Sequence, residues 1–167
     1  MNRFWILLLV LIGCSVLAYP QKNVLRKANK AYKSQNYYNS LQKFLHYKEL
    51  VNHRVTTDVM AKIANCYFYL NDYTKAKEYF DQIDREILIP DDVANYAELL
   101  QHLGLYKKAF AMFELAITKG AKKPLLKKHK ESCYWALMNI QKSEEYFVQL
   151  SNIETNGLSF GVQYYKN

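Results

Sequence analysis

The sequence from Tyr106 to Phe113 reads Tyr-Lys-Lys-Ala-Phe-Ala-Met-Phe, so that an aromatic residue is followed by alanine after three positions and by a second aromatic residue after four more. Offsets of three and seven residues fall on one face of an α-helix. The same spacing occurs twice more, at Tyr73, Ala76 and Phe80, and at Tyr37, Ser40 and Phe44. Three units of the chain therefore repeat one helical pattern.

The three patterns begin 36 and 33 residues apart, on either side of the 34-residue period of tetratricopeptide repeats. A small residue stands nine positions before each tyrosine, at Ala28, Ala64 and Ala97. Small side chains at these positions and in the triplets let paired helices approach closely. The sequence thus resembles the tetratricopeptide repeat family over residues 22–140. The third unit is the best match, and the first departs from the pattern because it has Ser40 where alanine is usual.

The spacing and the resemblance predict an all-α fold, a solenoid of about three antiparallel helix pairs with a further helix and a short β-prone tail. The helices are expected at residues 22–34, 37–52, 55–70, 73–87, 91–103, 106–119 and 122–140. Turn residues separate or close them at Asn36, Asn71-Asp72, Gly104 and Gly120. We expect the repeat domain to cover residues 22–140.

Residues 1–18 have the composition of an export signal peptide. The apolar run from Phe4 to Ile12 is shorter than the roughly 20 residues that span a bilayer. Leu11-Ile12-Gly13-Cys14 resembles a bacterial lipobox, in which Cys14 is acylated and becomes the mature N-terminus. Val16-Leu17-Ala18 suits ordinary signal peptidase instead, so both cleavages remain open. A lipid on Cys14 would anchor the chain to a membrane without spanning it.

The tail, residues 141–167, breaks the helical pattern, since Tyr146–Leu150 and Phe160–Tyr165 are β-prone. A lipobox, the repeats, Cys133-Tyr134-Trp135-Ala136 and then Leu158-Ser159-Phe160-Gly161 stand in an order that resembles exported Bacteroidota proteins of the OmpA family. The resemblance implies that the tail begins a WD40-like β-propeller domain. It also implies an outer-membrane lipoprotein facing the periplasm, related to the peptidoglycan-associated component of the type IX secretion system.

The residue patterns of common enzymes are missing from the sequence. The four histidines have no metal-binding spacing, and no glycine-rich phosphate loop or nucleophile elbow occurs. Cys66 and Cys133 also lack metal-binding spacing, and their apolar helical contexts predict buried free thiols. We therefore predict no catalytic residue, no metal, no cofactor and no small-molecule substrate.

The chain is basic, with a formal net charge of +8. Its lysines are scattered apart from one concentration between Lys119 and Lys130, which we expect to be a solvated face. No aromatic and basic signature of an RNA-binding module accompanies them, so no nucleic-acid partner is predicted.

By resemblance to the family, the first helix of each pair lines a concave groove that binds partners. The groove positions are Asn29, Tyr32, Lys33, Asn65, Phe68, Tyr69, Glu98, Gln101 and His102. They do not reproduce the version of the groove that grips a peptide carboxylate. A groove of aromatic and amide side chains suggests binding of a peptide or a partner helix. Packing between repeats is the alternative role for Phe68 and Tyr69.

These observations predict a non-enzymatic interaction or scaffold module of the cell envelope. Its expected partners are envelope proteins or peptides, and the lipid anchor is expected to attach the chain to the membrane. Two alternatives remain, a soluble secreted or periplasmic repeat protein and a passive spacer.

Overall fold

The computed structural model describes residues 21–140. A helix over residues 21–33 is followed by six more, and no strand occurs in this part of the chain. The six are α2 (Tyr37–Leu50), α3 (Thr57–Tyr69), α4 (Tyr73–Asp81), α5 (Pro90–His102), α6 (Tyr106–Thr118) and α7 (Leu126–Asn139). The predicted signal peptide with Cys14 and the predicted β-prone tail lie outside the described residues.

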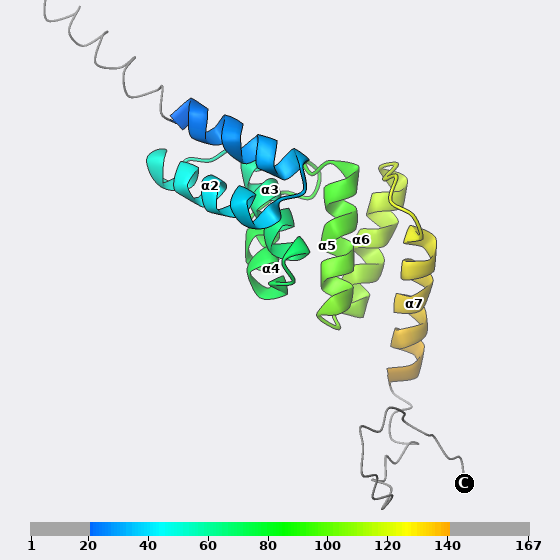
Figure 1. Cartoon of the computed structure of the whole chain (residues 1–167). Coiled ribbons are helices and arrows are strands. Elements are labelled where there is room, and N and C mark those ends of the chain that lie inside the picture. The colour runs from blue at the N-terminus through cyan, green and yellow to red at the C-terminus, as the bar shows by residue number, and fades with distance from the viewer. Residues whose placement is uncertain (1–20, 141–167) are drawn as a thin grey trace, which may run out of the picture.

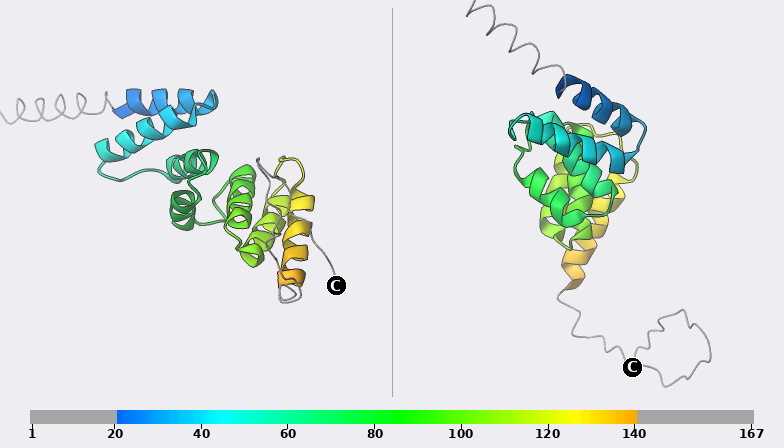
Figure 2. Two further views of the ribbon diagram at one scale, coloured as in Figure 1. Left: turned by 60° about the horizontal axis from the view of Figure 1, so that its bottom comes forward. Right: turned by 60° about the vertical axis from the view of Figure 1, so that its left-hand side comes forward.

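Successive helices form antiparallel pairs that stack into an elongated array (Figures 1 and 2). The helix over residues 21–33 pairs with α2, α3 with α4, and α5 with α6, while α7 packs on α6 at the end of the array. This arrangement confirms the predicted helix-pair solenoid. None of the helices in the described range is long and apolar enough to cross a bilayer.

The repeated sequence positions form the contacts within each pair. All three phenylalanines of the triplets and all three alanines that stand nine residues before the tyrosines are at most 1% exposed. Ser40 is fully buried, and its hydroxyl donates a hydrogen bond of 3.1 Å to the carbonyl oxygen of Ala28. The hydroxyl thus finds a partner in the facing helix, which explains how serine is accepted where the other units have alanine.

The turn inside each pair has the same geometry in all three units. The residue after the C-cap has a positive φ, at Gln35 (58°), Asn71 (61°) and Gly104 (71°). In each turn the amide of this residue and the amide of the next one donate to carbonyl oxygens of the last helical turn, as in a Schellman motif. Asn36 lies in the first of these turns, as expected, and its side chain also caps α2 by accepting a bond from the Asn39 amide.

Two helices are shorter than predicted by more than one turn. We expected a helix over residues 73–87, but α4 ends at Asp81, because the following turns direct both Ile83 and Leu88 into the core. We expected the last helix to begin at residue 122, but α7 begins at Leu126. Pro124 disfavours helical backbone at the residue before it, and Leu125 has a φ of 63°.

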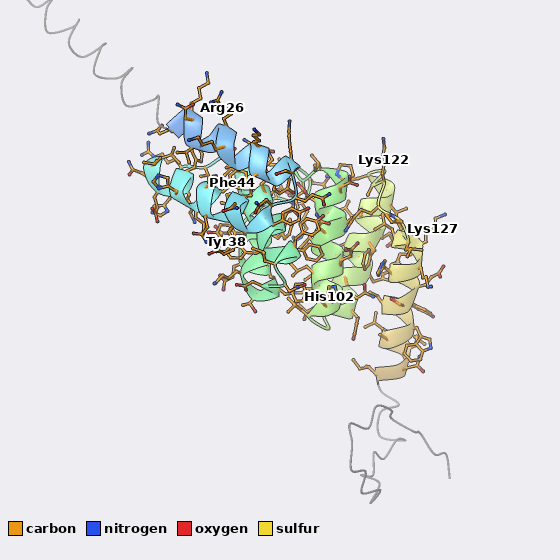
Figure 3. The ribbon with its side chains drawn as sticks, viewed as in Figure 1. Arg26, Tyr38, Phe44, His102, Lys122 and Lys127 are labelled. Carbon is orange, nitrogen blue, oxygen red and sulfur yellow. The ribbon has the colours of Figure 1, made fainter. Side chains whose placement is uncertain are left out.

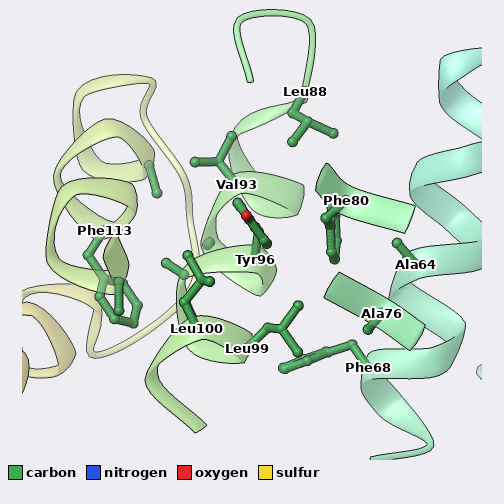
Figure 4. Close-up of a cluster of buried hydrophobic side chains, with 14 of the residues drawn as sticks. Ala64, Phe68, Ala76, Phe80, Leu88, Val93, Tyr96, Leu99, Leu100 and Phe113 are labelled. Atoms are coloured by element: carbon green, nitrogen blue, oxygen red, sulfur yellow. The ribbon is translucent and has the colours of Figure 1, made fainter. Parts of the chain in front are cut away.

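The core is divided into two clusters of buried apolar side chains. The larger joins α3 to α7, and Figure 4 shows Phe68 of α3, Phe80 of α4 and Leu99 of α5 within it. The smaller lies between the first pair and α3 and contains Phe44. Cys66 and Cys133 are buried free thiols, as predicted.

Candidate protein-binding groove

The predicted groove residues come from three helices that are the first members of their pairs. Asn29, Tyr32 and Lys33 lie on the helix over residues 21–33, Asn65, Phe68 and Tyr69 on α3, and Glu98, Gln101 and His102 on α5. Lys33, Tyr69 and His102 are exposed, whereas Asn65 and Phe68 are buried. The predicted set therefore divides into residues that a partner can reach and residues beneath them.

A chain of hydrogen bonds between side chains forms the floor of the groove. The Asn65 amide donates to the Asp92 carboxylate at 2.7 Å, and the Asn95 amide donates to the Asn65 carbonyl oxygen at 2.7 Å. Asn65 and Asn95 are only 1% and 4% exposed. Both amides therefore link α3 to α5, since a buried polar group must have a partner.

Lys123 extends this chain from the loop between α6 and α7. Its ammonium group donates to the Asn95 carbonyl oxygen at 2.7 Å and to both carboxylate oxygens of Glu98 at 2.8 Å. The same ammonium lies 5.6 Å from the centre of the Phe68 ring. Glu98 is therefore paired with Lys123, a lysine that was predicted to lie on a solvated face.

The basic concentration between Lys119 and Lys130 is accordingly only partly solvated. Lys119 donates to three backbone carbonyl oxygens of the turn that follows α4, at 2.8 to 3.0 Å. Lys130 lies 3.5 Å from the Glu114 carboxylate. Lys122, Lys127 and Lys128 are exposed, as expected.

The aromatic residues of the groove have different positions. Phe68 is 8% exposed and belongs to the larger core cluster, so it packs between repeats. Tyr69 is 39% exposed and stacks on Tyr37 with ring centres 4.3 Å apart. The His102 ring stacks on Tyr73 at 4.7 Å. The rings of Tyr69 and His102 are therefore fixed by stacking and remain exposed to a partner.

A hollow of about 510 Å³ lies where α5 faces α7. Three predicted residues line it together with residues of α7 and the preceding loop: Glu98, Gln101, His102, Leu125, Lys128, His129 and Ser132. Gln101 donates to the Ser132 hydroxyl at 2.7 Å and is paired with His129 at 3.0 Å. No groove role was predicted for α7, although α7 continues the row of first helices formed by the helix over residues 21–33, α3 and α5.

Burial changes the acid–base behaviour of the groove near its first helix. The pKa of the Tyr32 hydroxyl is raised, mainly by burial and secondly by the nearby Asp92 carboxylate. The pKa of Asp92 is raised by burial and then by the Asp58 and Asp91 carboxylates. On the same side, Lys62 donates to Asn29 at 2.9 Å and pairs with Asp58 at 2.7 Å. Asn29 thus joins the first helix to α3.

The groove offers hydrogen-bond donors and acceptors, two accessible rings and opposite charges, which are the elements of peptide recognition. Across residues 21–140, no three side chains of the metal-ligating types come together.

The fold was compared with solved structures. Over 69% of this chain it is similar to the tetratricopeptide repeat domain of Arabidopsis OM64, of which 94% is covered, with a TM-score of 0.56 and 16% identity. Over 83% of this chain it is similar to the tetratricopeptide repeat domain of Sgt2 from Aspergillus fumigatus, of which 91% is covered, with a TM-score of 0.57 and 12% identity. No protein-family model matches the sequence, and no curated protein matches it.

Proposed function

We propose that this chain is an exported interaction module of the cell envelope, held to the membrane by a lipid on Cys14, whose groove binds a peptide or helix of an envelope protein. Tetratricopeptide repeat domains generally mediate contacts between proteins. The groove carries the proposal, because it presents Tyr69 and His102 above a floor whose buried amides are all paired. Rigid aromatic rings of this kind are common anchors of interfaces.

The finer location rests on sequence features alone. The lipobox resemblance at Cys14 and the order of motifs shared with the OmpA family support an outer-membrane lipoprotein that faces the periplasm. In that position the module would serve a secretion assembly or a peptidoglycan-linked assembly. The β-prone residues 141–167 would lead into a further domain.

A passive spacer is the second candidate, and one observation favours it. Lys123 donates to both Glu98 and Asn95, and Asn65 donates to Asp92. Polar groups that are satisfied within the chain gain little from a partner. A spacer would therefore tolerate changes at the exposed rings.

The two candidates are separated by a crosslinking and binding experiment. A photoreactive phenylalanine analogue replaces Tyr69 in the chain expressed in its cells, and crosslinked envelope proteins are identified and purified. The matched control replaces Tyr38, which is 63% exposed on α2. Binding of the purified partner is then measured for Tyr69→Ala and His102→Ala, with Tyr38→Ala as the control.

We expect each groove substitution to weaken binding by about tenfold or more, the usual effect of losing an interface anchor. Thermal unfolding must show that both variants remain folded. Equal binding of the groove variants and Tyr38→Ala would refute the groove and leave the spacer.

Anchoring is tested separately by the intact mass of protein recovered from membranes. A diacyl or triacyl increment that disappears in Cys14→Ala would support the lipoprotein. A mass that begins at Tyr19 without lipid would replace it with a soluble exported protein.

A further inference from the structure

The helix over residues 21–33 is the most basic element of the described chain. It contains five lysine or arginine residues and no aspartate or glutamate. Four of the five recur at intervals of three or four residues and so share one face: Lys22, Arg26, Lys30 and Lys33. We call these four residues the basic face.

The basic face carries charge that the fold does not use. All four side chains are exposed, and no carboxylate of residues 21–140 lies within 4.0 Å of them. The basic concentration near α7 differs, because Lys119, Lys123 and Lys130 all have partners. Figure 3 shows Arg26 pointing away from the array, at the opposite end from Lys122 and Lys127. An external anion is therefore the natural counterpart of this face.

The shape of the face suits small anionic groups. Its four cations surround a shallow hollow of about 560 Å³, which Leu25 and Asn29 also line. Leu25 is only partly buried, so an apolar side chain lies among the cations. Cationic side chains around a partly apolar floor are the composition of protein surfaces that rest on anionic lipid.

The position of the helix in the chain indicates which anion it meets. Residue 21 follows Cys14 by seven residues, which span at most about 25 Å when extended. The helix begins nine residues after Ile12, the last residue of the apolar run. This step rests on the proposed function, because the export and lipid anchoring proposed above would bring the helix to a membrane surface. Attraction between lysine or arginine and anionic lipid acts within about 10 Å of that surface.

We propose that the basic face binds the headgroups of anionic phospholipids and holds the repeat array against the membrane surface. This contact is a second binding surface, which shares Asn29 and Lys33 with the proposed partner groove but does not include the Tyr69 and His102 rings. The first helix would lie on the lipid, with α3, α5 and α7 extending away from the site of attachment.

The proposal is tested with the mature chain from residue 19 onwards, so that no acyl group contributes. Within residues 21–140, the side chains of both core clusters lie between residues 25 and 133, so the mature chain retains all of them. Partition is measured by co-sedimentation with vesicles of phosphatidylglycerol and phosphatidylcholine, and with vesicles of phosphatidylcholine alone. We expect binding to the anionic vesicles only, and weaker binding at high salt.

The decisive variant is the triple substitution Lys22→Gln, Arg26→Gln and Lys30→Gln, which leaves the predicted groove residues unchanged. Each lost cation is expected to lower the partition about fivefold, so the triple variant should lose on the order of 100-fold. The matched control removes the same charge from exposed lysines elsewhere: Lys107→Gln, Lys108→Gln and Lys127→Gln. It should stay within about twofold of the unchanged chain, because those lysines lie on α6 and α7 and not on the basic face.

An equal loss in both triple variants would overturn the proposal, since net charge alone would then explain the binding. No binding of the unchanged chain to anionic vesicles would also overturn it. Binding of the basic face to an acidic peptide or to heparin, without vesicle binding, would assign it to another class of polyanion. The groove experiment with Tyr69→Ala is independent of all these outcomes.

Discussion

Substitution of Lys123 by methionine should destabilise the array by about 2–3 kcal/mol. The ammonium group lies 2.8 Å from both carboxylate oxygens of Glu98 and 2.7 Å from the Asn95 carbonyl oxygen. Breaking a fully buried pair costs about 3–5 kcal/mol, because one charge is left without a partner. The Lys123 and Glu98 side chains are 23% and 18% exposed, so water would offset part of that cost. Methionine has a side chain of similar length but lacks the ammonium group, so it loses the charge, the bonds to Glu98 and Asn95 and the contact of the ammonium with the Phe68 ring.

Urea unfolding followed by circular dichroism measures this difference in unfolding free energy. In thermal unfolding, the melting temperature should fall by about 6–12 °C. Lys130→Met is the matched control, because its pair with Glu114 is 3.5 Å long and the glutamate is 59% exposed. A surface pair of this kind contributes at most about 1 kcal/mol. Adding Glu98→Gln to Lys123→Met should restore about 1–2 kcal/mol, since no unpaired charge remains. The reasoning fails if Lys123→Met behaves like Lys130→Met, or if Glu98→Gln destabilises the Lys123→Met variant further.

Three further outcomes follow from the fold. Ser40→Ala should lose about 0.5–1.5 kcal/mol of unfolding free energy with its bond to Ala28, and Ser40→Val should lose more by overpacking; denaturant midpoints would show the order. Gln35→Gly should gain about 0.5–1 kcal/mol, because glutamine has a φ of 58° in a position that glycine adopts without strain; an unchanged melting temperature would contradict this. Burial raises the pKa of Cys66 from 9.0 to about 11, so the folded state disfavours the thiolate. The protonated thiol therefore contributes stability that is fully present below pH 9 and is lost as the pH rises from 9 to 11. The loss amounts to about 2 kcal/mol at pH 10.5. Cys66→Ala should therefore lose less unfolding free energy between pH 8 and pH 10.5 than the unchanged chain does. Equal losses for the two proteins in urea unfolding would contradict the raised pKa of Cys66.

The local pattern predicted the helix pairs because small and aromatic residues repeat at fixed offsets. Ala28, Ala64 and Ala97 are fully buried where the spacing placed them. Helix ends were less accurate where packing outside the helix decides them. Nothing in the order of residues 82–88 shows that Ile83 and Leu88 are both drawn into the core and end α4 early.

The groove was predictable in its elements but not in its internal bonds. Family resemblance gave the helices and the positions, including Asn65 and Glu98. The partners of these two residues, Asp92 and Lys123, lie 27 and 25 residues away. Lys123 was placed on a solvated face because its neighbours in sequence are basic, and only the fold shows that its loop returns to α5.

The division of the core into two clusters has a consequence for how the array opens. Tyr67 and Tyr79, whose rings stack 5.6 Å apart, pack against both clusters and connect them. The first pair otherwise depends on the smaller cluster alone, whereas α3 to α7 share the larger one. Repeat arrays open at the units with the weakest interfaces. Backbone amides of residues 21–50 should therefore exchange with solvent deuterium faster than those of α5. The first pair is thus the end of the array that is least protected in solution. Contact of its first helix with a membrane surface would slow the exchange of its amides.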